Sequence, residues 1–360
     1  MTHRDRLIKT LRCQPVDRPV LPMWLGFSPW GETLDRWRRE SGLTDIPLER
    51  MFGFDPFFAT APCNGFGPFP HFPERVLRED AEFTISTDFR GITRRNRRDG
   101  GSMPEWIDHP IKTPDDWKAY KAERMQPLLD GRLAGLAEFA AKANAGQLAV
   151  QAGSFPWGVF GTARDLLGAE GILFAFHDQP DMVRDIMDTH TTLWLALYER
   201  IAATVRIDHI HIWEDMSGRQ GSLISPAMIE DFMMPHYARI VAFARRHDVP
   251  IVSVDTDGRM DEIVAVMTRH GVNAFMPFEV QAGSDVEVFR QQYPALGLMG
   301  GLDKRALAAG KPEMHRELDR AGRMLALGGW VPGFDHLIPP DVPWENYSYF
   351  VTNLKRMIGL

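Results

Sequence analysis

Short apolar runs alternate with amphipathic stretches along most of this chain. Eight apolar runs are typical of buried strands, and they begin near residues 19, 55, 148, 209, 250, 274, 296 and 330. Stretches in which apolar residues recur every three or four positions predict helices, at about 3–12, 31–41, 160–174, 179–205, 225–247, 260–270, 284–292, 303–327 and 343–358. Strands that alternate with helices in this way are parallel and are joined by right-handed crossovers.

The strand count predicts the fold class. Eight β/α units in a chain of 360 residues fit a TIM (β/α)8 barrel, with residues 1–360 as a single α/β domain. An open, doubly wound sheet is the alternative architecture. No GxGxxG follows a strand and no GxxxxGK[ST] is present, so nothing supports a nucleotide-binding version of either fold.

One region interrupts the alternation of strands and helices. Residues 61–80 are rich in Pro, Phe and Gly and have no clear period, which is typical of a long loop. Residues 82–87 and 92–95 alternate apolar and polar side chains on either side of Asp88–Gly91, which predicts a β-hairpin. We therefore expect an insertion at about 61–112, after the second strand, that carries a small antiparallel element.

Composition and charge exclude several classes of protein. The chain is 44% hydrophobic and 25% charged, and its net charge of −7 comes from interspersed residues, unlike the clustered basic face of a nucleic-acid binder. The one basic run, 94–98, is typical of a solvated hairpin end or an interface. Cys13 and Cys63 do not have metal-ligand spacing. Without a signal peptide or a long apolar span, we expect a cytoplasmic protein with no membrane partner.

The functional site of a TIM barrel lies at the C-terminal ends of its strands. Most of the predicted ends carry a polar or charged side chain. Read in chain order, these ends are Trp24, Thr60, Gln151, Glu214 with Asp215, Asp255 with Asp257, Glu279, Asp303, and Asp335 with His336. We expect three of them, at Glu214–Asp215, Asp255–Asp257 and Asp335–His336, to meet in one site, with Gln151 and Glu279 among the residues that contact substrate.

The stretch Val254–Gly258 is the strongest candidate for chemistry. It places Asp255 and Asp257 directly after an apolar run, and a buried carboxylate is costly unless it is paired or binds a cation. With His336, these carboxylates would suit a divalent ion such as Zn, Mn or Fe. Asp257, His336 and Glu214 would equally serve as general acid and base without a metal. Both readings stay open, and we expect Asp255, Asp257 and His336 to converge.

Other polar candidates have plain structural explanations beside the functional ones. Arg219, in the loop 216–221, would hold a substrate carboxylate or would simply be solvated. His209 and His211 alternate within one predicted strand and therefore point the same way, into the barrel packing or into the site. Glu279 would contact substrate or lie in a solvated loop.

Several motifs resemble the uroporphyrinogen decarboxylase superfamily over nearly the whole chain. They are Arg4–Arg6 with Pro15–Pro19, Ile224–Pro226, Phe232, Pro235–Tyr237, and the closing Ile338–Pro343 with Glu345 and Asn346. The PPDVPxEN segment at the end is the most specific of them. The resemblance implies a TIM barrel, in agreement with the strand count.

The superfamily holds two chemistries, and each leaves a different signature. The porphyrinogen branch, which uses no cofactor, has an Arg-Gln-Ala-Gly-Arg segment near the first strand; here Trp24–Trp30 contains no arginine. The corrinoid-linked methyltransferase branch has zinc ligands in a His-x-Cys-Gly motif and a later Cys. The matching positions here are Asp255, Asp257 and His336, so a metal, with Zn the likeliest choice, would meet a harder ligand set.

The resemblance therefore implies an enzyme that moves a methyl group from a small methylated substrate to a corrinoid protein, with or without a metal. The aromatic lining predicted from Trp24, Phe27, Trp30, Trp157 and Trp213 suits a methyl ether or a methylammonium group, unless these rings are core packing. A decarboxylase and a non-catalytic tetrapyrrole- or corrinoid-protein-binding module are the alternatives. The oligomeric state is left open, with a homodimer as one option.

Overall fold

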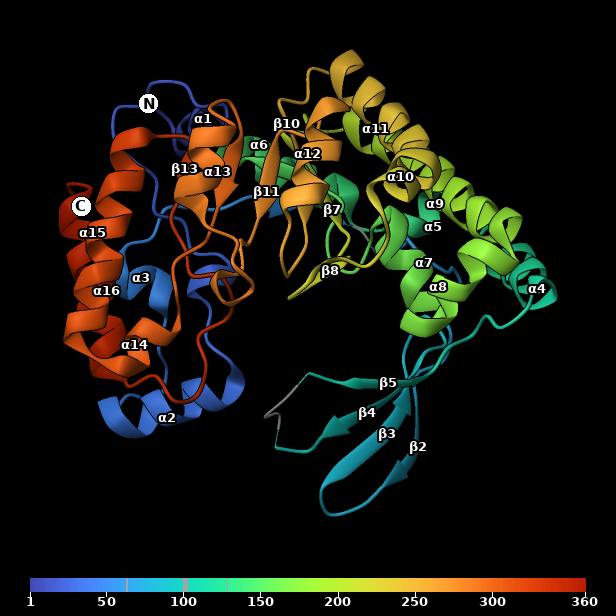
Figure 1. Cartoon of the computed structure of the whole chain (residues 1–360), viewed down its shortest axis with the longest axis horizontal. Helices are drawn as coiled ribbons and strands as arrows, with labels where there is room; N and C mark the ends of the chain where they lie inside the picture. The colour runs from blue at the N-terminus through green and yellow to red at the C-terminus, as the bar shows by residue number, and fades with distance from the viewer. Residues whose placement is uncertain (63, 100–102, 128) are drawn as a thin grey trace.

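The computed structural model of the chain describes residues 1–62, 64–99, 103–127 and 129–360, so Cys63 lies outside the described part. Seven strands form one parallel sheet (Figure 1). Its order is β1 (Ala59–Thr60), β6 (Val150–Ala152), β7 (His209–Trp213), β10 (Ile251–Asp255), β11 (Ala274–Met276), β12 (Gly297–Met299) and β13 (Trp330–Val331). The order follows the chain, as it does in a TIM barrel.

The eighth position of the barrel is filled without a regular strand. The segment predicted as the first strand bonds both of its neighbours: Met23 N donates to Asp55 O (3.3 Å), and Phe334 N donates to Gly26 O (2.9 Å). Pro22, which lacks an N–H, forms only an isolated bridge with Asp55. The barrel therefore closes where the sequence predicted, but the prediction of a regular strand at 19–26 was wrong.

Helices cover the outside of the sheet (Figure 1). In chain order they are α1 (His3–Leu11), α2 (Gly31–Ser41), α3 (Leu48–Phe52), α4 (Pro114–Arg124), α5 (Leu129–Arg132), α6 (Leu136–Gly146), α7 (Val159–Leu167), α8 (Ala169–Asp178), α9 (Pro180–Ala202), α10 (Pro226–Met228), α11 (Met234–Arg246), α12 (Asp261–Arg269), α13 (Val286–Gln292), α14 (Arg305–Ala309), α15 (Lys311–Leu327) and α16 (Trp344–Met357). The helix predicted at 303–327 is two helices, because Gly310 between them has a φ of +107°.

The insertion forms a second, antiparallel sheet. It contains β2 (Arg75–Glu79), β3 (Phe83–Thr87), β4 (Thr93–Arg97) and β5 (Glu105–Asp108), in that order. The hairpin predicted from 82–95 lies in it as β3 and β4, with Thr87 opposite Thr93. The sheet projects from the barrel (Figure 1), and both outer strands, β2 and β5, are exposed along their whole length.

Within the described residues, no helix combines the length and the apolar character that are needed to cross a membrane.

Candidate functional site

Asp255 ends the central strand β10, at the edge where the barrel strands finish. In the parallel register it lies beside Trp213 of β7 and Met276 of β11. Its side chain is 15% exposed. Burial raises the pKa of the Asp255 carboxyl well above its usual range, and the charges of Asp257 and Asp215 raise it further, while His336 lowers it. Asp255 therefore keeps its proton to a higher pH than an exposed aspartate does.

Asp257 and His336 come from different strand ends and meet directly. His336 Nε2 lies 3.1 Å from Asp257 Oδ1, and His336 Nδ1 lies 3.9 Å from Asp335 Oδ1, which is too long for a hydrogen bond. Burial lowers the pKa of His336, but the carboxylates of Asp257 and Asp335 outweigh this effect and raise it to about 10. His336 is therefore a cation between two carboxylates rather than a neutral base.

Four contacts fix the backbone that carries this pair. Gly258, with a φ of +76°, brings the chain so close to Ser217 that a Cβ would lie 2.6 Å from the Ser217 carbonyl. Glu279 accepts a hydrogen bond from Gly258 N (2.9 Å). Asp335 is fully buried, and it accepts from Val280 N (3.0 Å) and from Lys304 Nζ (3.1 Å). Asp257 and His336 are thus held on anchored turns.

The metal prediction is not supported by this arrangement. Across the described ranges, no group of three or more His, Cys, Asp or Glu side chains is placed to hold a metal ion. His336 Nε2 and Asp257 Oδ1 lie 3.1 Å apart and pair with one another. The zinc site stays a prediction.

A chain of buried polar groups runs along the barrel interior to Asp255. His209 Nε2 lies 2.6 Å from Ser253 Oγ, which lies 3.3 Å from His211 Nδ1; His211 Nε2 lies 3.6 Å from Asp255 Oδ2. Burial lowers the pKa of His211 to about 4, and burial with the charge of His211 lowers that of His209 well below its usual value. The two histidines are therefore neutral, and of the two only His211 lies next to Asp255 among the contacts of the described residues.

Glu214, predicted as a catalytic group, instead holds the start of a helix in place through hydrogen bonds. It is fully buried, and its oxygens accept hydrogen bonds from the backbone N–H groups of Val159, Phe160 and Gly161 at 2.7–3.0 Å, and from Tyr237 Oη at 2.6 Å. These amides begin α7, where a carboxylate satisfies unpaired N–H groups. With its oxygens occupied, Glu214 has no free acceptor for substrate, and the catalytic prediction does not fit this position.

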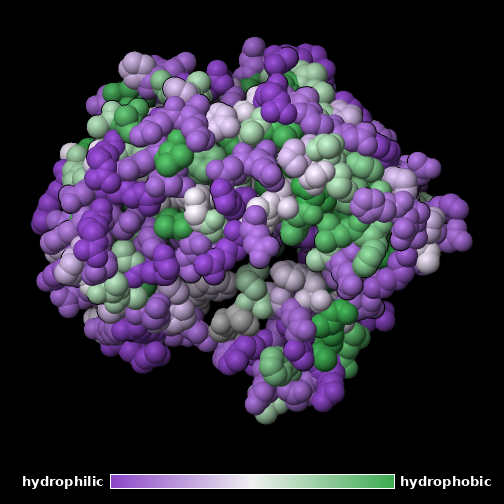
Figure 2. All heavy atoms as spheres, in the orientation of Figure 1, coloured by the Kyte–Doolittle hydropathy of each residue, from purple (hydrophilic) through white to green (hydrophobic). Residues whose placement is uncertain are grey.

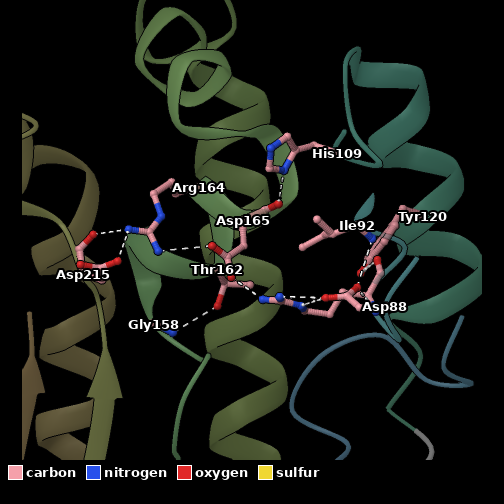
Figure 3. Close-up of polar contacts among 10 residues, drawn as sticks. Asp88, Ile92, His109, Tyr120, Gly158, Thr162, Arg164, Asp165 and Asp215 are labelled. Carbon is pink, nitrogen blue, oxygen red and sulfur yellow. Dashed lines mark hydrogen bonds and ion pairs between the residues drawn. The ribbon is translucent and has the colours of Figure 1, made fainter. Parts of the chain in front are cut away.

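A network of charges links the site to the inserted sheet (Figure 3). Arg164 of α7 donates to Asp215 Oδ2 (2.8 Å) and to Asp165 Oδ1 (3.3 Å). Arg90, in the turn between β3 and β4, donates to Asp165 and to Asp88. Asp215, next to the site, is thereby connected through three further residues to the base of the insertion.

The predicted substrate-binding residues are not all at the site. Trp213 is beside Asp255, with the Arg164 guanidinium 4.9 Å from its ring and the Phe155 ring 4.8 Å away. Trp24 is packed in the core, with its indole N–H bonded to Pro332 O (2.8 Å). Gln151 is buried and bonds Gly153 O (2.9 Å). Arg219 is exposed in the turn between β8 (Ser217–Gly218) and β9 (Gly221–Ser222).

Sequence reasoning missed Arg164, Lys304 and Ser253. Arg164 lies inside a predicted helix and Lys304 directly follows Asp303 at a predicted strand end, so neither stands out from an ordinary surface cation. Ser253 could have been predicted from the sequence, because it is a polar residue inside the apolar run 250–254 and a buried polar residue needs a hydrogen-bond partner.

The parallel barrel with its acid-rich strand ends has the architecture of a TIM-barrel enzyme. The profile of the Uroporphyrinogen decarboxylase (URO-D) family matches residues 95–357. The chain therefore belongs to the uroporphyrinogen decarboxylase family. A search of curated proteins finds no match.

Among solved structures, the chain is similar to a methyltransferase from Methanosarcina mazei. The two are 16% identical, with a TM-score of 0.63 and 99% of each chain covered, which supports the fold. A weaker likeness, to a putative vitamin-B12 independent methionine synthase from Listeria monocytogenes, has 11% identity, a TM-score of 0.30 and coverage of 51% of this chain and 58% of the other; it is too low to argue from.

Proposed function

We propose that this protein, a URO-D-like enzyme, moves a methyl group from a small methylated donor to a corrinoid carried by a partner protein, with Asp255 as the proton donor. The observation that carries the proposal is a buried carboxyl at the end of β10, beside Asp257 and Asp215, whose pKa is raised well above its usual value. Such a group keeps a proton to give at neutral pH.

The reaction needs an acid because a methyl ether or amine has a poor leaving group. As the methyl–oxygen bond of an ether breaks, the bonding pair stays on oxygen, and the proton of Asp255 passes to that oxygen. The acceptor, a reduced corrinoid on the partner protein, would supply the electron pair for the new bond to the methyl carbon. His336, held 3.1 Å from Asp257, offsets the negative charge that develops on Asp255.

The charges around Asp255 favour a neutral or cationic methyl group over a polyanionic substrate. The nearby cations Arg164 and Lys304 are engaged by Asp215 and Asp335. Trp24–Trp30 contains no arginine, so the first-strand segment offers no cation for acetate side chains. Decarboxylation of uroporphyrinogen is therefore the less favoured chemistry.

The test supplies free, reduced cobalamin as the acceptor and follows its absorbance change on methylation. The donors are a methoxybenzene series, methylamines and methanol, and a parallel assay follows carbon dioxide release from uroporphyrinogen. We expect methylation with at least one donor and no carbon dioxide release. Decarboxylation without any methyl transfer would contradict the proposal and establish the alternative reaction.

A further inference from the structure

The two outer strands of the inserted sheet leave its edges open. β2 and β5 are outermost in the order β2-β3-β4-β5, and every residue of both is exposed. Figure 2 shows hydrophobic side chains on the surface of this projecting sheet, among hydrophilic ones. On the outer strands they are Val76 and Leu77, 62% and 57% exposed, and Trp106 and Ile107, 37% and 44% exposed. An outer strand with such side chains is a place where another strand can add to the sheet.

The two edges carry opposite charges at the same spacing. β2 has Arg75 and Arg78, β5 has Glu105 and Asp108, and in each strand the charged residues enclose two apolar ones. If β2 of one copy lay antiparallel to β5 of another, with Arg75 opposite Asp108, then Arg78 would lie opposite Glu105 and the apolar residues would lie opposite one another. Charge and hydrophobicity therefore match at all four positions. Glu79, at the end of β2, lies beyond them.

The four charged residues lie in two straight rows that run across the sheet. The rows are Arg75, Thr87, Thr93 and Asp108, and Arg78, Ile85, Arg95 and Glu105. Residues in one row share a face, and so do rows that are two residues apart on the inner strands, so all four charged side chains project from the same face. Adding β2 of a second copy beside β5 would continue both rows with the opposite charge.

Each outer strand also has a β-bulge, and the two bulges match. Leu77 is the extra residue of β2, and Ile107 is the extra residue of β5. A bulge normally protects an edge, because a regular strand does not keep its register beside it. In the antiparallel alignment, Leu77 lies opposite Trp106 and Ile107 lies opposite Val76, so one bulge lies opposite the other. The two edges therefore disfavour regular strands and fit each other.

The charges on these edges are only partly used within one copy. Arg75 has no ion pair in the described part of the chain, and the ion pair of Arg78 is long, at 3.8 Å. Glu105 and Asp108 each pair with a basic residue of their own copy, and all four side chains of those pairs are at least 44% exposed. Because exposed pairs contribute little to stability, sharing these charges with a second copy has a small cost.

We propose that the inserted sheet is a self-association surface, in which β2 of one copy pairs antiparallel with β5 of a second copy. Pairing of identical edges is disfavoured: with the same four residues, two β2 strands would set Arg75 opposite Arg78, and two β5 strands would set Glu105 opposite Asp108. The contact is head-to-tail, so further copies add to the open edges and form a ring or an open chain. Because it is small, association occurs at high protein concentration.

The experiment is sedimentation equilibrium of the full chain over a concentration series up to about 0.5 mM. We expect the average mass of the wild type to rise with concentration. Arg75→Glu should weaken association at least about tenfold, because it sets an acid opposite Asp108, and Asp108→Arg should do the same, because it sets a base opposite Arg75. The double variant exchanges the two charges and should associate like wild type, as should an equimolar mixture of the two single variants.

Arg97→Glu is the matched control. Arg97 is on the inner strand β4, opposite Phe83, and it projects from the same face as Arg75. The control makes the same change in net charge as Arg75→Glu but alters neither edge, so association should stay at the wild-type level. All variants should keep wild-type thermal unfolding. A wild type that is monomeric throughout the series, or association that persists in both single variants, would overturn the proposal. Failure of the double variant and the mixture to regain association would overturn it too.

Discussion

At the residue scale, Asp255 combines burial with two like-charged neighbours, and this combination has a cost in stability. Its pKa is raised in the folded protein, so the folded state keeps a proton that the unfolded chain releases near its ordinary pKa of about 3.9. Stability attributable to this group therefore falls as pH rises from the unfolded pKa through the folded one. Ionisable side chains at functional sites often have shifted pKa values that lower the stability of the folded protein in this way.

We therefore predict that Asp255→Asn becomes more stable relative to wild type as the pH rises from 4 to 8. Each unit of separation between the two pKa values contributes about 1.4 kcal/mol to this difference. Urea unfolding of both proteins across the interval measures it. A variant that is less stable than wild type by a constant amount at every pH would show that Asp255 does not titrate in this way.

The charge of His336 stabilises the folded protein, whereas the charge of Asp255 destabilises it, and in both cases stability falls as the pH rises. The pKa of His336 is raised to about 10 by Asp257 and Asp335, against the effect of burial, so its positive charge stabilises the folded protein. That stabilisation is complete below the unfolded pKa of about 6.5 and is lost as pH rises to about 10. We predict that His336→Gln is destabilised at pH 6 and that the difference from wild type shrinks by pH 10. Thermal unfolding at both values tests this, and a gap independent of pH contradicts it.

His336→Ala should also lower turnover, by about 100-fold or more, while the protein remains folded. The reason is that Asp257 loses its partner at 3.1 Å and the site loses its cation. Turnover and bound metal per chain are measured together. If turnover is unaffected, His336 has no part in the site; if metal is bound by wild type and lost in the variant, the metal prediction regains support.

The sequence predicted where functional side chains lie better than it predicted which of them are free to act. Asp257 and His336 follow strand ends that are far apart in the chain, and in the structure they are 3.1 Å apart. Glu214 also ends a strand, but its partners are amides more than fifty residues earlier, at the start of α7. Nothing local in the sequence distinguishes an occupied carboxylate from a free one.

At the element scale, the outer strands of the inserted sheet, β2 and β5, are exposed along their whole length and bury no residue against the barrel. The charged attachment of this sheet through Arg90, Asp88 and Asp165 is therefore important for its position. The hairpin could be predicted because the alternation of apolar and polar side chains that indicates it lies within one short stretch of sequence. This attachment joins residues 75 positions apart and could not be predicted from the pattern.

We predict that Asp165→Asn loosens the inserted sheet. The change removes a buried charged acceptor of Arg90 and should cost about 1–3 kcal/mol. Hydrogen exchange should become faster in β2–β5 and stay unchanged in β10 and β11. Glu105→Gln, which removes an exposed pair with Arg95, is the control and should cost about 1 kcal/mol or less. Equal exchange in all three proteins would mean that this attachment does not position the sheet.

At the scale of the whole molecule, the barrel was predictable because alternating strands and helices admit few topologies. The regular strand predicted at 19–26 does not form because Pro19 and Pro22 cannot donate backbone hydrogen bonds to a neighbouring strand. The barrel closes there through scattered hydrogen bonds such as Phe334 N to Gly26 O. The barrel sets strand ends from different parts of the chain side by side. A shared site at these ends is the reason to expect catalysis there.

The most direct test of the account is the rate of cobalamin methylation by a methyl ether donor, compared between wild type and Asp255→Asn at pH 7. If Asp255 gives its proton to the leaving oxygen, the variant should be slower by about 100-fold or more, since asparagine cannot supply a proton. Glu214→Gln should keep the wild-type rate per folded molecule while losing stability. An Asp255→Asn protein that transfers methyl groups at the wild-type rate would contradict the account.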